Sequence, residues 1–263
     1  MLSRKKFYHP PGEKMTNRLG EMQSSTAEHV MTGACGKKKV SQAGFHWVVV
    51  VVLLCISEPF LGQSTAQVAE HSRALERSGQ LLFERGVLLY RREAAADKRE
   101  ALSFFLRAAE DFKAGGAVGK EATAMLLAGF AAKSISEDRE ALRYFENALL
   151  LFQKAKHHPG EIDALIHIGV AHYHLGELDK ALDQLNQALE LSRKVRERRG
   201  AANALCAIAQ VYTTKKELEK AINVYNEALP MLRALDDRDA EARAYNNLQV
   251  ITTELRNQQK SKN

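Results

Sequence analysis

Five of the nine histidines in this sequence crowd into one short stretch: His157, His158, His167, His172 and His174. Imidazole nitrogens are common zinc ligands. If the stretch is helical, His167 and His174 are seven residues apart and share a face, whereas His172 points elsewhere. No carboxylate is evident that would fix these rings as ligands. A metal-dependent enzyme is therefore the least favoured function, and we expect no metal and no other cofactor.

The cysteines offer equally little catalytic chemistry. Cys35 and Cys55 lie before residue 67, so the rest of the chain has only Cys206 and cannot form an internal disulfide. Cys206 lies in the apolar run 204–208, where a free thiol behaves as a small hydrophobic side chain. The sequence shows no Ser/His/Asp or Cys/His constellation and no phosphate-binding loop after a strand. We therefore predict that the protein is not an enzyme.

The net charge of +6 at pH 7 comes mostly from the first quarter of the chain. Residues 1–66 contain eight Lys or Arg and four Asp or Glu, so the remaining residues carry a net charge of only +2. There the two signs alternate, as they do on solvated helix faces, and no basic patch with interspersed aromatic residues is present. Nucleic acid is therefore not an expected partner.

The first 66 residues are predicted to be a leader. Residues 47–56 are continuously apolar, but ten residues are too few for a helix to cross a bilayer, which needs about 20. Three lysines at 37–39 precede this run, and small residues at 64 and 66 follow it. This order predicts a secretory signal peptide cleaved after Ala66, with Met31 as the natural start. An uncleaved membrane anchor and a fortuitous apolar run are the alternatives.

A period of forty residues organises the rest of the sequence. Similar segments begin at Ala101, Ala141, Ala181 and Ala221, without a gap between the four. Apolar residues recur at spacings of three and four, which predicts helices. A partner segment lies ahead of each, so that units begin near residues 80, 120, 160 and 200. Each unit is predicted to be a helix, a tight turn and a second helix, and the fold class is therefore all-α.

The unit from residue 160 resembles the tetratricopeptide repeat. Its Gly169, Gly176, Ala181, Leu185 and Ala188 match the small, turn and large apolar positions of that repeat. The resemblance covers residues 80–258 and implies a right-handed α-solenoid of antiparallel helix hairpins. The forty-residue units are similar to those in bacterial CHAT-domain-associated and kinesin light chain-type arrays. The same resemblance places His172 where tyrosine usually packs.

The predicted domain boundaries follow from these patterns. The leader occupies residues 1–66, a helical extension 67–79, the array 80–258, and a polar tail 259–263. The last helix of the array, 241–258, is expected to cap the solenoid. A downstream domain lost from the gene is the alternative.

In proteins that this one resembles, the first helices of successive hairpins line a concave groove that binds peptides. Transferring those positions unit by unit predicts the following partner-binding residues: Lys133, Ser134, Asp163, His167, Tyr173, His174, Asn203, Gln210, Thr213, Arg243 and Asn246. The set is mixed in charge and lacks the lysine cluster that would hold the paired carboxylates of chaperone tails.

The sequence thus predicts a non-catalytic scaffold that binds a protein or peptide partner through this groove. The leader predicts export to a bacterial periplasm or to the outside of the cell, with no stable membrane span after cleavage. The alternative is the detached sensing or regulatory arm of a CHAT-type, caspase-like protease system.

Overall fold

The computed structural model describes residues 42–260, with side chains from residue 65 onward. The chain divides into two compact units, Met1–Ser64 and Thr65–Asn263. The predicted start at Met31 and the lysines at 37–39 lie outside the described residues. The apolar run 47–56 and the predicted cleavage point after Ala66 both fall within helix α2 (Gln42–Tyr90). In the part of the chain that the structure describes, no helix is long and apolar enough to span a membrane.

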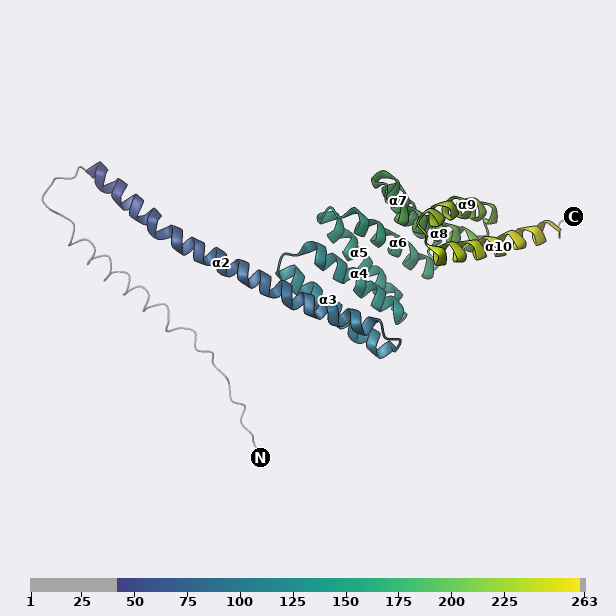
Figure 1. Cartoon of the computed structure of the whole chain (residues 1–263), viewed down its shortest axis with the longest axis horizontal. Helices are drawn as coiled ribbons and strands as arrows, with labels where there is room; N and C mark the ends of the chain where they lie inside the picture. Colours follow the sequence, from purple (N-terminus) through teal and green to yellow (C-terminus); the bar gives the residue numbers. More distant parts are fainter. Residues whose placement is uncertain (1–41, 261–263) are drawn as a thin grey trace, which may run out of the picture. The chain divides into compact units, whose positions relative to one another are not determined.

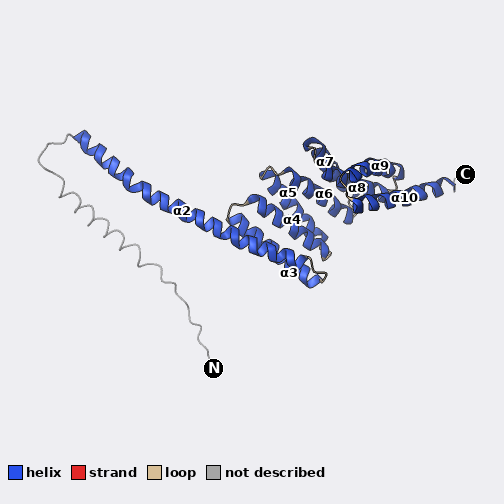
Figure 2. Ribbon diagram, in the orientation of Figure 1, coloured by secondary structure: helices blue, strands red, loops and turns tan. Residues whose placement is uncertain are grey.

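Every regular element between residues 42 and 260 is a helix, which confirms the predicted all-α class (Figure 2). From α5 onward, each helix begins twenty residues after the one before it, so two helices and two short turns make up the forty-residue period. Successive helices lie side by side along the second unit (Figure 1). After α2 they are α3 (Ala95–Ala114), α4 (Val118–Ser134), α5 (Asp138–Lys154), α6 (His158–His174), α7 (Leu178–Val195), α8 (Arg198–Thr214), α9 (Leu218–Ala234) and α10 (Arg238–Lys260).

Each turn of the array reverses the chain in the same way. One residue per turn has a positive φ, and these residues recur every twenty positions from Gly116 to Asp236. Gly176, which matches the turn position of the repeat, takes this left-handed conformation with φ of 80°. Lys216, which replaces the turn glycine in the next unit, also adopts it, with φ of 62°. The Glu177 N–H donates to the His172 carbonyl at 2.9 Å, which closes the helix end as a Schellman motif does.

The helices of a hairpin approach closely because a small residue on the first helix faces a large one on the second. A Cβ added to Gly169 would lie 2.6 Å from Cγ of Leu185, and one added to Gly129 would overlap the Phe145 ring. Leu185 and Phe145 are both completely buried. Gly129 and Gly169 are therefore packing residues.

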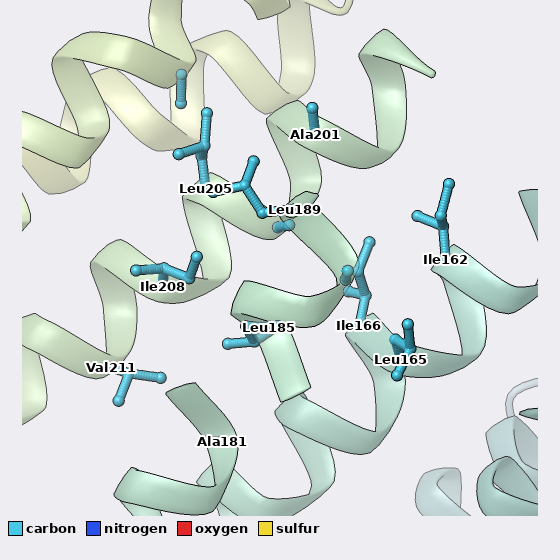
Figure 3. Close-up of a cluster of buried hydrophobic side chains, with 13 residues drawn as sticks. Ile162, Leu165, Ile166, Ala181, Leu185, Leu189, Ala201, Leu205, Ile208 and Val211 are labelled. Atoms are coloured by element: carbon cyan, nitrogen blue, oxygen red, sulfur yellow. The ribbon is translucent and has the colours of Figure 1, made fainter. Parts of the chain in front are cut away.

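Apolar side chains from α6, α7 and α8, together with Ala228 of α9, form one continuous core cluster (Figure 3). Ile162 and Ile166 of α6, Leu185 of α7, and Leu205 and Ile208 of α8 meet there. Each first helix therefore packs on the hairpin before it as well as on its own second helix, which is how a solenoid builds a core without long-range chain crossings.

In the first hairpin, the small residue that makes room for the large one lies at a different position. Leu89 stands where later units have glycine or alanine, and it is buried among the side chains of α3 and α4. Gly86, three residues earlier, provides the space instead: a Cβ there would lie 2.7 Å from the Phe105 ring. Gly79 likewise leaves space for Phe112, because a Cβ added to Gly79 would lie 3.0 Å from the Phe112 ring.

Two glycines of α4 allow a matched test of this packing. We expect Gly129→Ala to lower the free energy of unfolding by about 1–3 kcal/mol, because the methyl group overpacks against the Phe145 ring. Gly119 has no atom within 4 Å of an added Cβ, so Gly119→Ala should instead raise it by about 0.5 kcal/mol through backbone entropy. Urea titrations of both variants measure the difference. Equal effects at the two positions would contradict the packing explanation.

Candidate functional site

The eleven predicted groove residues all lie on first helices of the array, and five of them surround one depression. The depression has a volume of about 530 Å³ and receives side chains from five helices, α4, α6, α8, α9 and α10. We call it the groove pocket. Its lining consists of Lys133, Val170, Tyr173, His174, Gln210, Thr213, Thr214, Tyr225, Asn247, Val250 and Ile251.

The repeat register explains why residues far apart in sequence meet in the groove pocket. Lys133, Tyr173 and Thr213 are spaced by forty residues and therefore occupy the same place on three successive first helices. His174 and Gln210 complete the five predicted residues that line the pocket. These five are brought together because each helix repeats the orientation of the helix two before it.

The sequence prediction missed six lining residues. Val170 and Val250 lie forty residues on either side of Gln210, so the register contained a signal for them, but the prediction favoured polar side chains. Tyr225 comes from a second helix, and no rule based on first helices could have found it. Its Oη accepts a hydrogen bond from Asn247 Nδ2 at 3.1 Å, and burial raises the pKa of Tyr225 to about 12.

Six predicted residues lie outside the groove pocket: Ser134, Asp163, His167, Asn203, Arg243 and Asn246. The Oγ of Ser134 donates to the Phe130 carbonyl at 2.8 Å and lies 3.2 Å from the Tyr90 hydroxyl. Asn203 and Arg243 are exposed and forty residues apart, so they extend the polar surface along α8 and α10. Asn246 is exposed on α10.

Asp163 lies outside the groove pocket, on the first turns of α6. Its side chain is exposed, yet desolvation raises the pKa of its carboxyl group, and the negative charge of Glu197 raises it further.

Lys133 is the one side chain among the lining residues that carries a full positive charge at neutral pH. It is half-buried, and this desolvation lowers the pKa of its ammonium group, while the negative charge of Asp138 opposes the shift. A partly desolvated cation gains more from an opposite charge than a fully hydrated one does. The groove pocket therefore favours a ligand with a carboxylate near Lys133.

His167 belongs to the core between hairpins rather than to the groove pocket. Its ring centroid lies 4.4 Å from that of Phe130 in an edge-to-face contact and 5.4 Å from that of Phe145 in a stacked contact. Burial lowers the pKa of His167 to about 4, and the nearby charge of Lys133 contributes. The imidazole is therefore neutral at physiological pH and acts as a packing residue.

The other histidines of the cluster have separate partners. His157 Nδ1 accepts the Gly160 N–H at 3.0 Å, and His158 contacts Glu161 at 3.2 Å. His172 is buried, and its Nδ1 lies 2.7 Å from Glu177 Oε2. Among the residues with described side chains, no group of three His, Cys, Asp or Glu could hold a metal ion.

Cys206 is half-buried, and burial raises the pKa of its thiol to about 11, which disfavours the thiolate.

A second depression of about 410 Å³ lies at the turn before α4 and the turn before α6. Its lining includes Gly119, Lys120, Phe152 and His157. The Lys120 ammonium group is already 2.8 Å from Glu76, and His157 already caps a helix. We therefore regard the groove pocket as the candidate site.

Comparison with known proteins agrees with the architecture. The family model of the tetratricopeptide repeat matches residues 120–194 and again residues 162–234. No curated protein matches the sequence closely enough to be counted as a relative.

Three solved structures illustrate the similarity of fold. The apo form of RapI has 16% identity and a TM-score of 0.59, over 64% of this chain and 60% of that protein. A Podosopora anserina protein with nearly identical TPR-like repeats of the kinesin light chain type has 14% identity and a TM-score of 0.52, over 68% and 94%. The Rap conjugation gene regulator of plasmid pLS20, in complex with the Phr* peptide, has 16% identity and a TM-score of 0.50, over 68% and 54%. The chain thus spans less than two thirds of the Rap proteins.

The neutral state of His167 makes stability depend on pH. The folded pKa of about 4 lies below the ordinary value of 6.5, so the unfolded chain binds this proton first as the pH falls. The stability that the folded chain gains from keeping His167 neutral is fully present above pH 6.5. It declines as the pH falls towards 4, by at most about 3 kcal/mol because the ring is not fully buried. In chemical denaturation at several pH values, His167→Phe should lose less stability than the wild type between pH 6.5 and 4. Parallel curves would contradict the assignment.

Proposed function

This chain is a tetratricopeptide repeat protein, and we propose that it is a non-catalytic scaffold that binds an extended segment of a partner protein in the groove pocket. The observation that carries the proposal is the pocket itself, about 530 Å³ in volume and lined by five helices. Its volume lies within the range of ligand sites in proteins, about 300–1,000 Å³. An open groove across several helices suits an extended chain better than a small compact molecule.

The Rap regulator of plasmid pLS20 supports this proposal by analogy. That protein has the same type of fold and was solved in complex with the Phr* peptide. The identity of 16% shows a common fold and no more. The choice of ligand must therefore follow from the side chains of this chain.

Apolar groups that line the groove pocket favour an aliphatic side chain of the partner. Val250 is 66% exposed on α10, and Val170 faces the same depression from α6. Tyr173 adds a ring whose hydroxyl lies 3.1 Å from Thr214 Oγ1. Burying an aliphatic side chain against these residues removes apolar surface from water, which is favourable by about 25 cal/mol per Å².

Polar groups around this apolar centre would fix the direction of the bound segment. The desolvated ammonium group of Lys133 would attract a carboxylate of the partner. Gln210 and His174 lie in the same depression and can exchange hydrogen bonds with a peptide main chain. We therefore propose a partner segment with an acidic residue close to an aliphatic one.

A non-catalytic role agrees with the chemistry of the lining residues. Among them there is no carboxylate and no cysteine, so His174 has no acidic partner within the groove pocket to orient it as a base. Thr213 and Thr214 donate to backbone carbonyls of their own helix, at 2.8 Å and 3.2 Å. These hydroxyl groups are thus engaged in the helix rather than activated as nucleophiles.

We also propose that the protein is exported. The support comes from the sequence alone: basic residues at 37–39, an apolar run at 47–56, and small residues at 64 and 66. Export would place the groove pocket in a bacterial periplasm or outside the cell, where it could meet secreted or surface proteins.

A display library of linear peptides, screened against the full chain, tests the binding proposal. Selected peptides should combine an acidic with an aliphatic residue, and Lys133→Glu or Val250→Asp should weaken their binding at least about tenfold, or 1.4 kcal/mol. Leu150→Gln is the matched control, because Leu150 is as exposed as Val250 but lies on α5, outside the groove pocket. Peptides that bind all three variants equally would contradict the groove pocket as the site.

N-terminal sequencing tests the export proposal. Expressed in a bacterium with its native leader, the protein should appear in the periplasm or medium with Gln67 as its first residue. Ala66→Lys should block cleavage, since the processing enzyme needs a small residue directly before the cut. Wild-type protein that stays in the membrane fraction with its leader would indicate an anchor, and cytosolic protein would contradict export.

A further inference from the structure

The outward face of α2 carries two exposed leucines, and one of them, Leu88, stands at a position that is buried in later hairpins. Leu88 is 64% exposed, whereas Ala128, Ile168 and Ile208, at successive intervals of forty residues, are 0–3% exposed. Leu81, seven residues before Leu88, is 69% exposed. In later hairpins the preceding hairpin covers this face. Here α2 is the first helix that the structure describes, and no described side chain covers the two leucines.

The residues between these leucines show that the face is not suited to another hairpin of the same kind. Glu84 stands where Ala124, Ala164 and Ala204 are completely buried. Arg85 occupies the position of the buried Leu205. A preceding hairpin would bury both charges without partners, at a large desolvation cost. A partner that binds this face must therefore have apolar groups against the leucines, a cation near Glu84 and an anion near Arg85.

Helix geometry gives this face a simple symmetry. With about 100° of rotation per residue, Leu81 and Leu88 form one stripe, which Ala74 continues one heptad earlier. Glu84 then lies on one flank of the stripe and Arg85 on the other. Both are exposed: Glu84 accepts a hydrogen bond from Gln80 at 2.9 Å, and the Arg85 guanidinium lies 5.6 Å from the Phe104 ring centroid.

We propose that this face binds the same face of a second copy of the chain, with the two α2 helices parallel. A two-fold axis along the helices sets Leu81 against Leu81 and Leu88 against Leu88. It also brings the Glu84 flank of each copy next to the Arg85 flank of the other, so the ion pair forms twice. An antiparallel pair would place Glu84 beside Glu84 and Arg85 beside Arg85, and charge repulsion disfavours that arrangement.

The stripe is short, so the dimer is weak. Stable dimers bury about 800 Å² on each partner, more than two leucines, one alanine and the stems of two charged side chains provide. We therefore expect dissociation constants in the range of about 10–100 μM, with charge complementarity setting orientation and partner choice more than affinity. The proposal is independent of the function proposed for the groove pocket.

Sedimentation equilibrium of the full chain, with Glu84→Arg and Arg85→Glu as variants, tests the pairing. Each variant alone sets like charges against each other and should weaken the dimer at least about tenfold. An equimolar mixture should dimerise again, since one copy then offers two arginines and the other two glutamates. The double variant Glu84→Arg/Arg85→Glu should also recover. Circular dichroism verifies that each chain stays helical.

Further variants separate this face from other sources of association. Leu88→Gln should weaken the dimer, whereas Leu150→Gln, at an equally exposed leucine of α5, should not. With an added thiol oxidant that accepts the two electrons, Ala74→Cys should form an intermolecular disulfide between the two introduced thiols, identified by peptide mapping, because parallel helices bring equal positions together. A monomer at about 300 μM, above the expected dissociation constants, would overturn the proposal. So would a dimer unaffected by either charge reversal, single variants that fail to recombine, or absence of the Ala74→Cys disulfide.

Discussion

The contact between a small residue on one helix and a large one on the next is the constraint on which the whole array depends. Gly169 under Leu185 and Gly129 under Phe145 allow two helix backbones to approach until a side chain fills the remaining space. A methyl group at either glycine would occupy the place of its neighbour. Because the same contact recurs in successive hairpins, the hairpins stack in one relative orientation, and that orientation decides which side chains share a surface.

The constant stacking turns sequence distance into spatial proximity. Helices that begin every twenty residues place Lys133, Tyr173 and Thr213 side by side, although eighty residues separate the first from the last. The same register that assembles the groove pocket buries Ala128, Ile168 and Ile208 between hairpins and leaves Leu88 uncovered at the start of the array. The groove pocket and the exposed outward face of α2 thus both follow from the same helix packing.

Electrostatics distinguishes residues that bind from residues that pack. Lys133 on α4 and His167 on α6 were both predicted to line the groove, but their environments differ. Lys133 keeps its charge in a half-buried position at the groove pocket, where a negatively charged group would interact favourably with it. His167 lies between two phenylalanine rings and stays neutral, so it contributes packing rather than recognition.

The sequence by itself determined the helices, the period of forty and the left-handed turn at Gly176, because these depend on local periodicity and on backbone conformation. It also predicted Lys133, Tyr173, His174, Gln210 and Thr213 as groove residues, and the structure brings these five together around one depression. Only the tertiary structure moved His167 into an aromatic cluster, brought Tyr225 of a second helix to the groove pocket, and left Leu81 and Leu88 exposed. Those outcomes depend on which neighbouring helix is present and how far its side chains reach, and periodicity along one helix contains no information about either.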